Sequence, residues 1–197
     1  MALLSRASAR RSVGIAAATL AVVAIAPSSL HGQAMTQDEA LTLAFGTAEV
    51  ERRTAYLDEG QLERAREMAG PRVRIDQGIL PYYVATDGDS PVGVAYFDAH
   101  RVRTLQEVLM IVVDPGDRVV RVETVSFREP QEYEAPEGWL AQFPGRELDD
   151  ELSLRGAIAP ITGATLTANA VTRAVRRVLA LHQVIDPFGS TPEAASR

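Results

Sequence analysis

The sequence contains no cysteine and no lysine, so each of its 20 basic side chains is an arginine. The absence of cysteine excludes disulfides, iron–sulfur clusters, attached haem c, thiolate zinc sites and thiol nucleophiles. The absence of lysine excludes Schiff-base catalysis and the lysine of a phosphate-binding P-loop. Three histidines are few for a metal site built from imidazoles. The metal and redox chemistry open to this chain is therefore narrow.

The rest of the composition is that of an ordinary globular protein. The 197 residues are 46% hydrophobic and 23% charged, which is the balance of a soluble domain. This length is enough for one well-formed core. The formal net charge of −6 argues against nucleic acid as a partner.

Residues 1–34 are predicted to be an export signal and no part of the fold. Three arginines precede an uncharged apolar run, residues 13–26, whose 14 residues suit a secretory signal and are short for a membrane span. A small-x-small cleavage site ends at Ala34. We expect an exported protein that begins near Met35, in the periplasm or on the outer face of the cytoplasmic membrane. Its net charge would change from −6 to −9, because three arginines leave with the signal. An uncleaved membrane anchor is the alternative.

Residues 35–79 are predicted to form a helical and extended segment ahead of the main domain. A capping box at Thr36 and Glu39 predicts a short helix that ends near Gly46. A strand is expected over 49–57 and a second helix over 59–69.

Residues 80–185 are predicted to form the main domain, of the α+β class, in which helices cover an antiparallel β-sheet with meander topology. Asp114-Pro-Gly-Asp117 predicts a tight turn with a positive φ at Gly116. After this turn, over residues 118–127, valines alternate with charged residues. This pattern predicts that one face of the last strand is buried and the other is exposed to solvent. The four strands are expected at 80–86, 92–97, 105–113 and 118–127.

An amphipathic helix is predicted from Thr165 to about His182. Its arginines, Arg173, Arg176 and Arg177, are expected on a solvated face, with contact to a partner or to anionic lipid as the alternative. A cation at His182 would suit the carboxyl end of the helix dipole. Residues 186–197 are predicted to be a disordered tail.

The loop Ile161-Thr-Gly-Ala-Thr-Leu-Thr167 leads into this helix. The first amides of a helix lack intrahelical partners, and the helix dipole places partial positive charge there. Gly163 and Ala164 are small, so a ligand can approach the backbone closely. The pattern predicts a phosphate or anion site. The alternative is that the threonines only cap the helix.

Residues 162–167 resemble the [Ser/Thr]-Gly-Ala-Thr-x-[Ser/Thr] flavinylation motif of FMN-binding domains, found in RnfG/NqrC-type subunits of membrane redox complexes and in related exported flavoproteins. In that family a flavin transferase attaches FMN from FAD to the second threonine of the motif through a phosphoester bond. The resemblance therefore implies attachment at Thr165. It assigns the cofactor site to Thr162, Gly163, Ala164, Thr165, Leu166 and Thr167, with Glu129 from the turn after the last strand.

The family usually has an acidic residue three positions before the motif, where this chain has Ala159. Non-covalent FMN, or no FMN, is therefore the alternative to attachment at Thr165. Tyr133 and Trp139 could pack on the flavin ring or anchor loops. His100 could assist proton transfer to the flavin or be a surface residue.

The resemblance implies an exported FMN-binding electron-transfer protein. It would be matured by a flavin transferase, and it would pass electrons to or from a membrane or periplasmic redox partner protein. The alternatives are a flavin-free binding or assembly module on the same fold and a periplasmic flavin reductase. No catalytic residue and no metal site is assigned.

Overall fold

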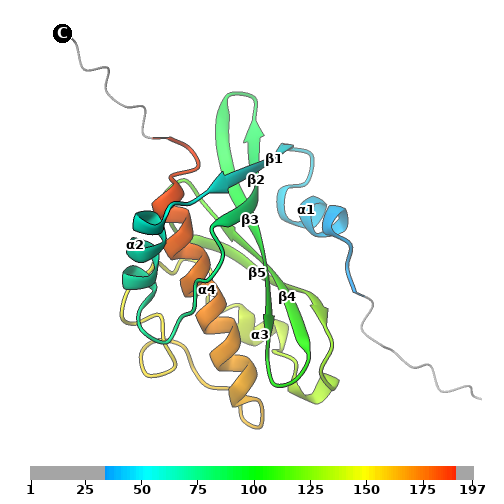
Figure 1. Ribbon diagram of the computed structural model, residues 1–197. Helices are drawn as coiled ribbons and strands as arrows, with labels where there is room; N and C mark the ends of the chain where they lie inside the picture. Colours follow the sequence, from blue (N-terminus) through cyan, green and yellow to red (C-terminus); the bar gives the residue numbers. More distant parts are fainter. Residues whose placement is uncertain (1–33, 190–197) are drawn as a thin grey trace, which may run out of the picture. The chain divides into compact units, whose positions relative to one another are not determined.

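A computed structural model of the protein describes residues 34–189, which form a five-stranded antiparallel sheet with helices on both faces (Figure 1). The strands lie in the sheet in the order in which they occur in the chain, which confirms the predicted α+β meander. The predicted export signal, up to residue 33, and tail residues 190–197 lie outside the described part. The strands are β1 (Glu49–Tyr56), β2 (Ile79–Asp87), β3 (Ser90–Arg101), β4 (Gln106–Val113) and β5 (Val119–Phe127).

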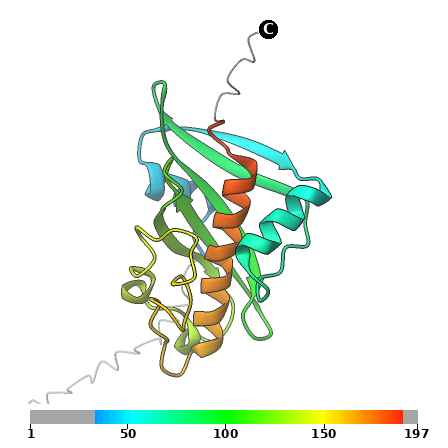
Figure 2. The ribbon, with the colours of Figure 1, turned by 90° about the vertical axis from the view of Figure 1, so that its left-hand side faces the viewer.

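The helix α4 (Thr165–Ile185) packs across one face of the sheet and forms the main core with it (Figure 2). Its apolar residues recur with helical spacing, so one side of the helix is apolar along its length. The short helices η1 (Gln131–Tyr133) and α3 (Glu137–Leu140) precede a turn-rich segment that leads to α4. The α4 residues in this core are Val171, Ala174, Val175, Val178 and Leu179, and they meet strand residues that include Val94, Tyr96, Leu109 and Ile111.

The N-terminal segment is built into the same sheet. β1 pairs with β2 from Glu49 opposite Thr86 to Tyr56 opposite Ile79. The helix α2 (Glu59–Ala69) packs against α4, and both predicted helices have the bounds that their capping boxes set. The helix α1 (Gln37–Phe45) covers the opposite face of the sheet, where its Ala40 is fully buried. A domain boundary at residue 80 stays a prediction.

The turn between β4 and β5 differs from the prediction in one position. The positive φ lies at Asp117, at 62°, and not at Gly116. The amides of Gly116 and Arg118 both donate to Oδ1 of Asp114, at 2.8 and 2.9 Å, so this side chain organises the turn. Aspartate tolerates the left-handed region better than most residues, because its short polar side chain bonds locally.

The predicted alternation of β5 is also wrong. Val119, Val122 and Val125 are buried at a spacing of three, and Val120 is 49% exposed. The pairing of β4 with β5 shifts register twice, and each bulge changes which face the following residues meet. Val122 therefore packs on the α4 side and Val125 on the α1 side.

No helix within residues 34–189 is long and apolar enough to cross a membrane.

The first residues of the predicted tail, 186–189, continue directly from α4. Phe188 lies edge-on to the His182 ring, with 6.1 Å between the ring centroids.

The dependence of the fold on the α4 core can be measured with Leu179→Ala. Leu179 is 0% exposed, and its truncation should lower the free energy of unfolding by about 2 to 5 kcal/mol, measured by urea denaturation. The same substitution at Leu43, which is 45% exposed on α1, should cost about 0.5 kcal/mol or less. Equal losses in the two variants would contradict this account of the core.

Candidate functional site

The motif loop reaches α4 through a left-handed turn at Gly163. Its φ is 83°, and a Cβ atom added there would meet no atom within 4 Å. Glycine is therefore required by the backbone conformation and not by crowding. Trp139 holds the preceding loop in place, because its Nε1 donates to the Ala159 carbonyl at 2.6 Å. Trp139 also packs edge-on against Phe143, so the structure shows it as a loop anchor.

The amino end of α4 has no side-chain cap. Ala164 occupies the N-cap position and makes no side-chain hydrogen bond to the helix, whereas Thr36 and Asp58 cap α1 and α2 with complete capping boxes. The expectation that the threonines only cap the helix is therefore wrong. The first amides of α4, and the partial positive charge that they carry, remain available to an anion.

The three threonines of the motif have different roles. Thr167 is 1% exposed, and its hydroxyl donates to the Tyr133 carbonyl at 2.5 Å. Thr162 and Thr165 are exposed, and neither hydroxyl has a hydrogen-bond partner among the described residues. Thr165 is the one that also lines a cavity. Thr167 thus fixes the loop before α3 against α4, and Thr165 presents a free hydroxyl.

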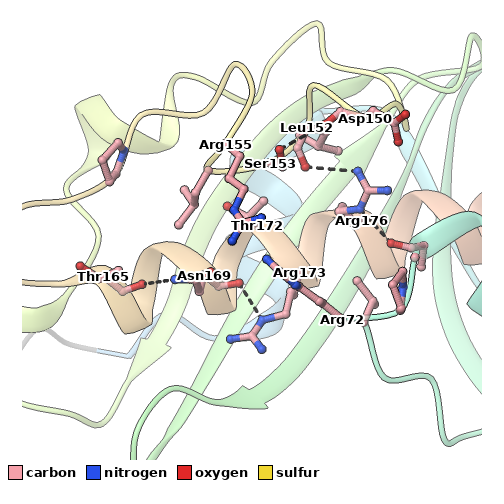
Figure 3. A pocket seen from close by; sticks show the side chains of 16 residues that line it. Arg72, Asp150, Leu152, Ser153, Arg155, Thr165, Asn169, Thr172, Arg173 and Arg176 are labelled. Carbon is pink, nitrogen blue, oxygen red and sulfur yellow. Dashed lines mark hydrogen bonds between the residues drawn. The ribbon is translucent and has the colours of Figure 1, made fainter.

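A cavity of about 580 Å³ runs along one side of α4 (Figure 3). Its floor is a single helix face, because Thr165, Asn169, Thr172 and Arg176 follow one another at helical spacing. Cofactor and ligand pockets commonly have this size. The remaining lining residues come from three segments, namely residues 69–73, residues 150–155 and Pro160.

Arg176 ties the cavity walls to α4. Its guanidinium donates to the carbonyls of Ala69 at 2.8 Å, Asp149 at 2.5 Å and Leu152 at 3.3 Å. Arg177 makes a two-bond ion pair with Asp98, at 2.7 and 2.8 Å. The predicted solvated arginine face is therefore wrong for these two residues, and of the three arginines it holds only for Arg173, which is exposed.

Other predicted cofactor residues lie outside the cavity. Ala164 and Thr167 are buried beside it, while Thr162, Gly163 and Leu166 are exposed and do not line it.

Glu129 organises the loop between β3 and β4. Its Oε1 accepts from the amides of Arg103, Thr104 and Leu105 at 3.1, 2.6 and 2.8 Å. The bonds from Leu105 and Thr104 lower the pKa of Glu129 more than burial raises it. Glu129 does not line the cavity, and its predicted contact with the flavin stays a prediction.

A buried row of charges begins at the Arg177–Asp98 pair. Both ring nitrogens of His100 face carboxylates, with Nδ1 2.8 Å from Asp98 and Nε2 2.9 Å from Glu107. Its side chain is 11% exposed, so the expectation of a surface histidine is wrong. Burial lowers the pKa of His100, but the hydrogen bonds to Asp98 and Glu107 outweigh burial and raise it. Burial, followed by the charge of Glu107, raises the pKa of Glu134.

His182 lies in a different environment near the end of α4. Its Nδ1 is 2.7 Å from the Tyr96 hydroxyl, and its Nε2 is 3.2 Å from the Asp117 carboxylate. Burial raises the pKa of Tyr96 and lowers that of His182. Because the Asp117 carboxylate can only accept, this arrangement suits a neutral ring that carries its proton on Nε2 and accepts from the Tyr96 hydroxyl at Nδ1. The helix dipole would favour a cation at this position, but burial lowers the pKa of His182 and so disfavours the charged form.

The difference between the motif threonines predicts different costs for the same substitution. Thr167→Val keeps the shape but removes the donor to the Tyr133 carbonyl, and it should lower the free energy of unfolding by about 1 to 3 kcal/mol. Thr165→Val removes a hydroxyl without a protein partner and should change it by about 0.5 kcal/mol or less. Urea denaturation of both variants tests this, and a larger loss for Thr165→Val would refute the assignment.

The two described histidines should titrate on opposite sides of the ordinary value of about 6.5. NMR titration of the imidazole signals should place the pKa of His100 above that value and the pKa of His182 below it. The variants His100→Gln and His182→Gln assign the signals. The reverse order would contradict the hydrogen bonding described here.

The directions of the two pKa shifts also determine how each histidine makes the free energy of unfolding depend on pH. The contribution of His100 is complete below about pH 6.5 and is lost as the pH rises through its raised pKa. His182 acts oppositely, because its buried ring resists protonation, so its environment loses stability as the pH falls below about 6.5.

The residues of the cavity and the motif suit FMN in three respects. A phosphate fits the uncapped helix start, a hydroxyl is free at that point, and the cavity has the volume of a cofactor pocket. Within residues 34–189, no group of three or more His, Cys, Asp or Glu side chains is placed so that it could hold a metal ion.

Comparison with known proteins points to the same cofactor. Residues 106–180 match the family described as the FMN-binding domain, a region that runs from the start of β4 into α4. Among solved structures, NqrC from Shewanella oneidensis is similar at 14% identity with a TM-score of 0.47, over 77% of this chain and 90% of NqrC. No curated protein sequence matches the chain. Residues 106–180 thus match the FMN-binding domain family, the family that the motif at residues 162–167 resembles.

Proposed function

We propose that this protein is an exported electron-transfer flavoprotein that carries FMN on Thr165 through a phosphoester bond. The observation that carries the proposal is the free hydroxyl of Thr165 at the uncapped start of α4, on the edge of the cavity. The family match supports FMN as the cofactor. Export and the redox partner are inferred from the sequence. Attachment at Thr165 is inferred from the motif and from the chemistry of the threonine hydroxyl.

The attachment step needs only the Thr165 hydroxyl and an FAD donor used by a flavin transferase. The threonine oxygen forms a bond to the phosphorus of the FMN half. The bond from that phosphorus to the AMP half breaks, AMP leaves, and the hydroxyl proton passes to the solvent. Thr165 is exposed, so the transferase can reach it without unfolding α4.

Once attached, the phosphate would be held by the first amides of α4. The helix dipole favours negative charge at this end, and among the described residues no side chain caps these amides. FMN supplies the redox chemistry when bound, and the protein binds, orients and shields it. A covalent bond would retain the cofactor outside the cytoplasm, where a dissociated flavin is lost.

The departure at Ala159 favours one alternative, a flavin-free module with the same fold. Ala159 is exposed, and both of its backbone polar groups are bound, with the amide donating to Gln142 at 2.9 Å and the carbonyl accepting from Trp139. Only the missing carboxylate distinguishes this position from the family pattern. A transferase that reads this carboxylate would load the protein slowly.

Attachment can be tested by co-expression with a flavin transferase, followed by in-gel flavin fluorescence of the denatured protein. The wild type should give a fluorescent band and a mass increase equal to bound FMN without water. Thr165→Val should abolish both, because it removes the acceptor oxygen that lies on the edge of the cavity.

Thr162→Val is the matched control, because Thr162 is an exposed motif hydroxyl that does not line the cavity. It should keep the band. Ala159→Asp should raise the loaded fraction severalfold if the transferase reads the carboxylate. A dark wild type with a bright Ala159→Asp would favour the flavin-free module, and a bright Thr165→Val would rule out attachment there.

A further inference from the structure

The cavity beside α4 is positively charged in a chain of negative net charge. Four arginines line it, Arg72, Arg155, Arg173 and Arg176, against one carboxylate, Asp150, although the formal charge of the chain is −6. Two of these arginines have hydrogen-bond partners in the protein. Arg176 donates to the carbonyls named above, and Arg173 donates to the Asn169 carbonyl at 3.0 Å. Such a cavity suits a ligand that carries or acquires negative charge.

Arg72 and Arg155 differ from the other two arginines. Within residues 34–189, neither makes a hydrogen bond or an ion pair that would explain its place at the cavity. They come from two separate walls, since Arg72 follows α2 and Arg155 belongs to the turn-rich segment before α4. Figure 3 shows Arg155 on one side of α4, between Thr165 and Arg176, and Arg72 on the other side, near Arg173 and Arg176. Two arginines without a hydrogen-bond partner among the described residues thus line the same cavity from different walls.

The cavity extends along α4 from Thr165 toward Arg176, so Thr165 and these arginines line the same cavity. Arg176 is eleven residues after Thr165 on the same helix face, which corresponds to about 16 Å at 1.5 Å per residue. If FMN were joined by its phosphate at Thr165 and extended along this face, its ring would lie in the part of the cavity that Arg72 and Arg155 line, and the phosphate would stay with the amides.

We infer that Arg72 and Arg155 bind the N1–C2 carbonyl edge of the flavin ring in this cavity and stabilise the negative charge that appears there on reduction. The inference rests on the proposed function, because it takes FMN to be attached at Thr165. Reduction brings two electrons from a redox partner protein and one proton from the solvent, and the ring changes from neutral to singly negative. Charge near N1 is a means by which proteins tune flavins.

Arg72 falls outside the matched FMN-binding region, residues 106–180. The N-terminal segment, through α2 and the residues after it, would therefore contribute a residue that sets the reduction potential. This gives that segment a role at the site besides its place in the sheet.

Sulfite binding tests the inference without turnover. Sulfite adds its sulfur lone pair to N5 of the oxidised ring, which places a negative charge on the same edge and bleaches the absorbance. In FMN-loaded protein, Arg72→Gln with Arg155→Gln should weaken sulfite binding at least tenfold. The midpoint potential should fall by about 30 mV for each tenfold loss in relative affinity for the reduced flavin.

The matched control is Arg52→Gln with Arg64→Gln, which removes the same charge from two exposed arginines that do not line the cavity. It should leave sulfite affinity and potential unchanged. Equal values for the cavity variant and the wild type would overturn the inference, and so would an equal effect of the control.

A second arm separates the inference from covalent attachment. Thr165→Val protein, which cannot be loaded at that position, is titrated with free FMN while fluorescence quenching is followed. Quenching that weakens at least tenfold when Arg72→Gln and Arg155→Gln are added supports the cavity assignment even if attachment fails. Attachment together with arginine-independent sulfite binding overturns the cavity assignment alone. Absence of both attachment and FMN binding overturns both proposals.

Discussion

The packing of α4 against the sheet is the constraint on which the rest of the structure depends. The helix buries one side along most of its length, so its axis and rotation are set by contacts with β3 and β4. The position of Thr165 follows from those contacts, because the first turn of the helix cannot move without the turns behind it. The Thr167 hydroxyl adds a fixed point one turn in, on the Tyr133 carbonyl. A core helix thereby also orients the candidate site.

Arginine chemistry completes this scaffold in a chain without lysine. A guanidinium presents several donors in a plane, so a single Arg176 can satisfy carbonyls from α2 and from residues 149–152 together. Arg177 uses the same geometry on the Asp98 carboxylate. These contacts hold both walls of the cavity to one helix, and within residues 34–189 Arg72 and Arg155 are the cavity arginines without a hydrogen-bond partner.

The sequence predicted those parts of the molecule that depend on neighbouring residues. Helix bounds at Thr36 and Gly46, the strands and the motif loop all follow from local spacing, caps and alternation. The failures involve residues far apart in the chain. Glu129 meets amides 24 to 26 residues away, and Arg177 meets Asp98 across 79 residues, so no window of sequence contains both partners. The burial of β5 depends on bulges in its pairing with β4, which alternation within one strand cannot reveal.

The place of Thr165 on the edge of its own cavity has a further consequence for how tightly the ring must bind. A group held by a short flexible linker experiences an effective concentration in the millimolar range at a nearby site. A ring anchored at Thr165 would need only millimolar intrinsic affinity for the cavity to be seated about half of the time. Weak contacts would then be sufficient, and they would let an attached ring leave the cavity and return without being lost.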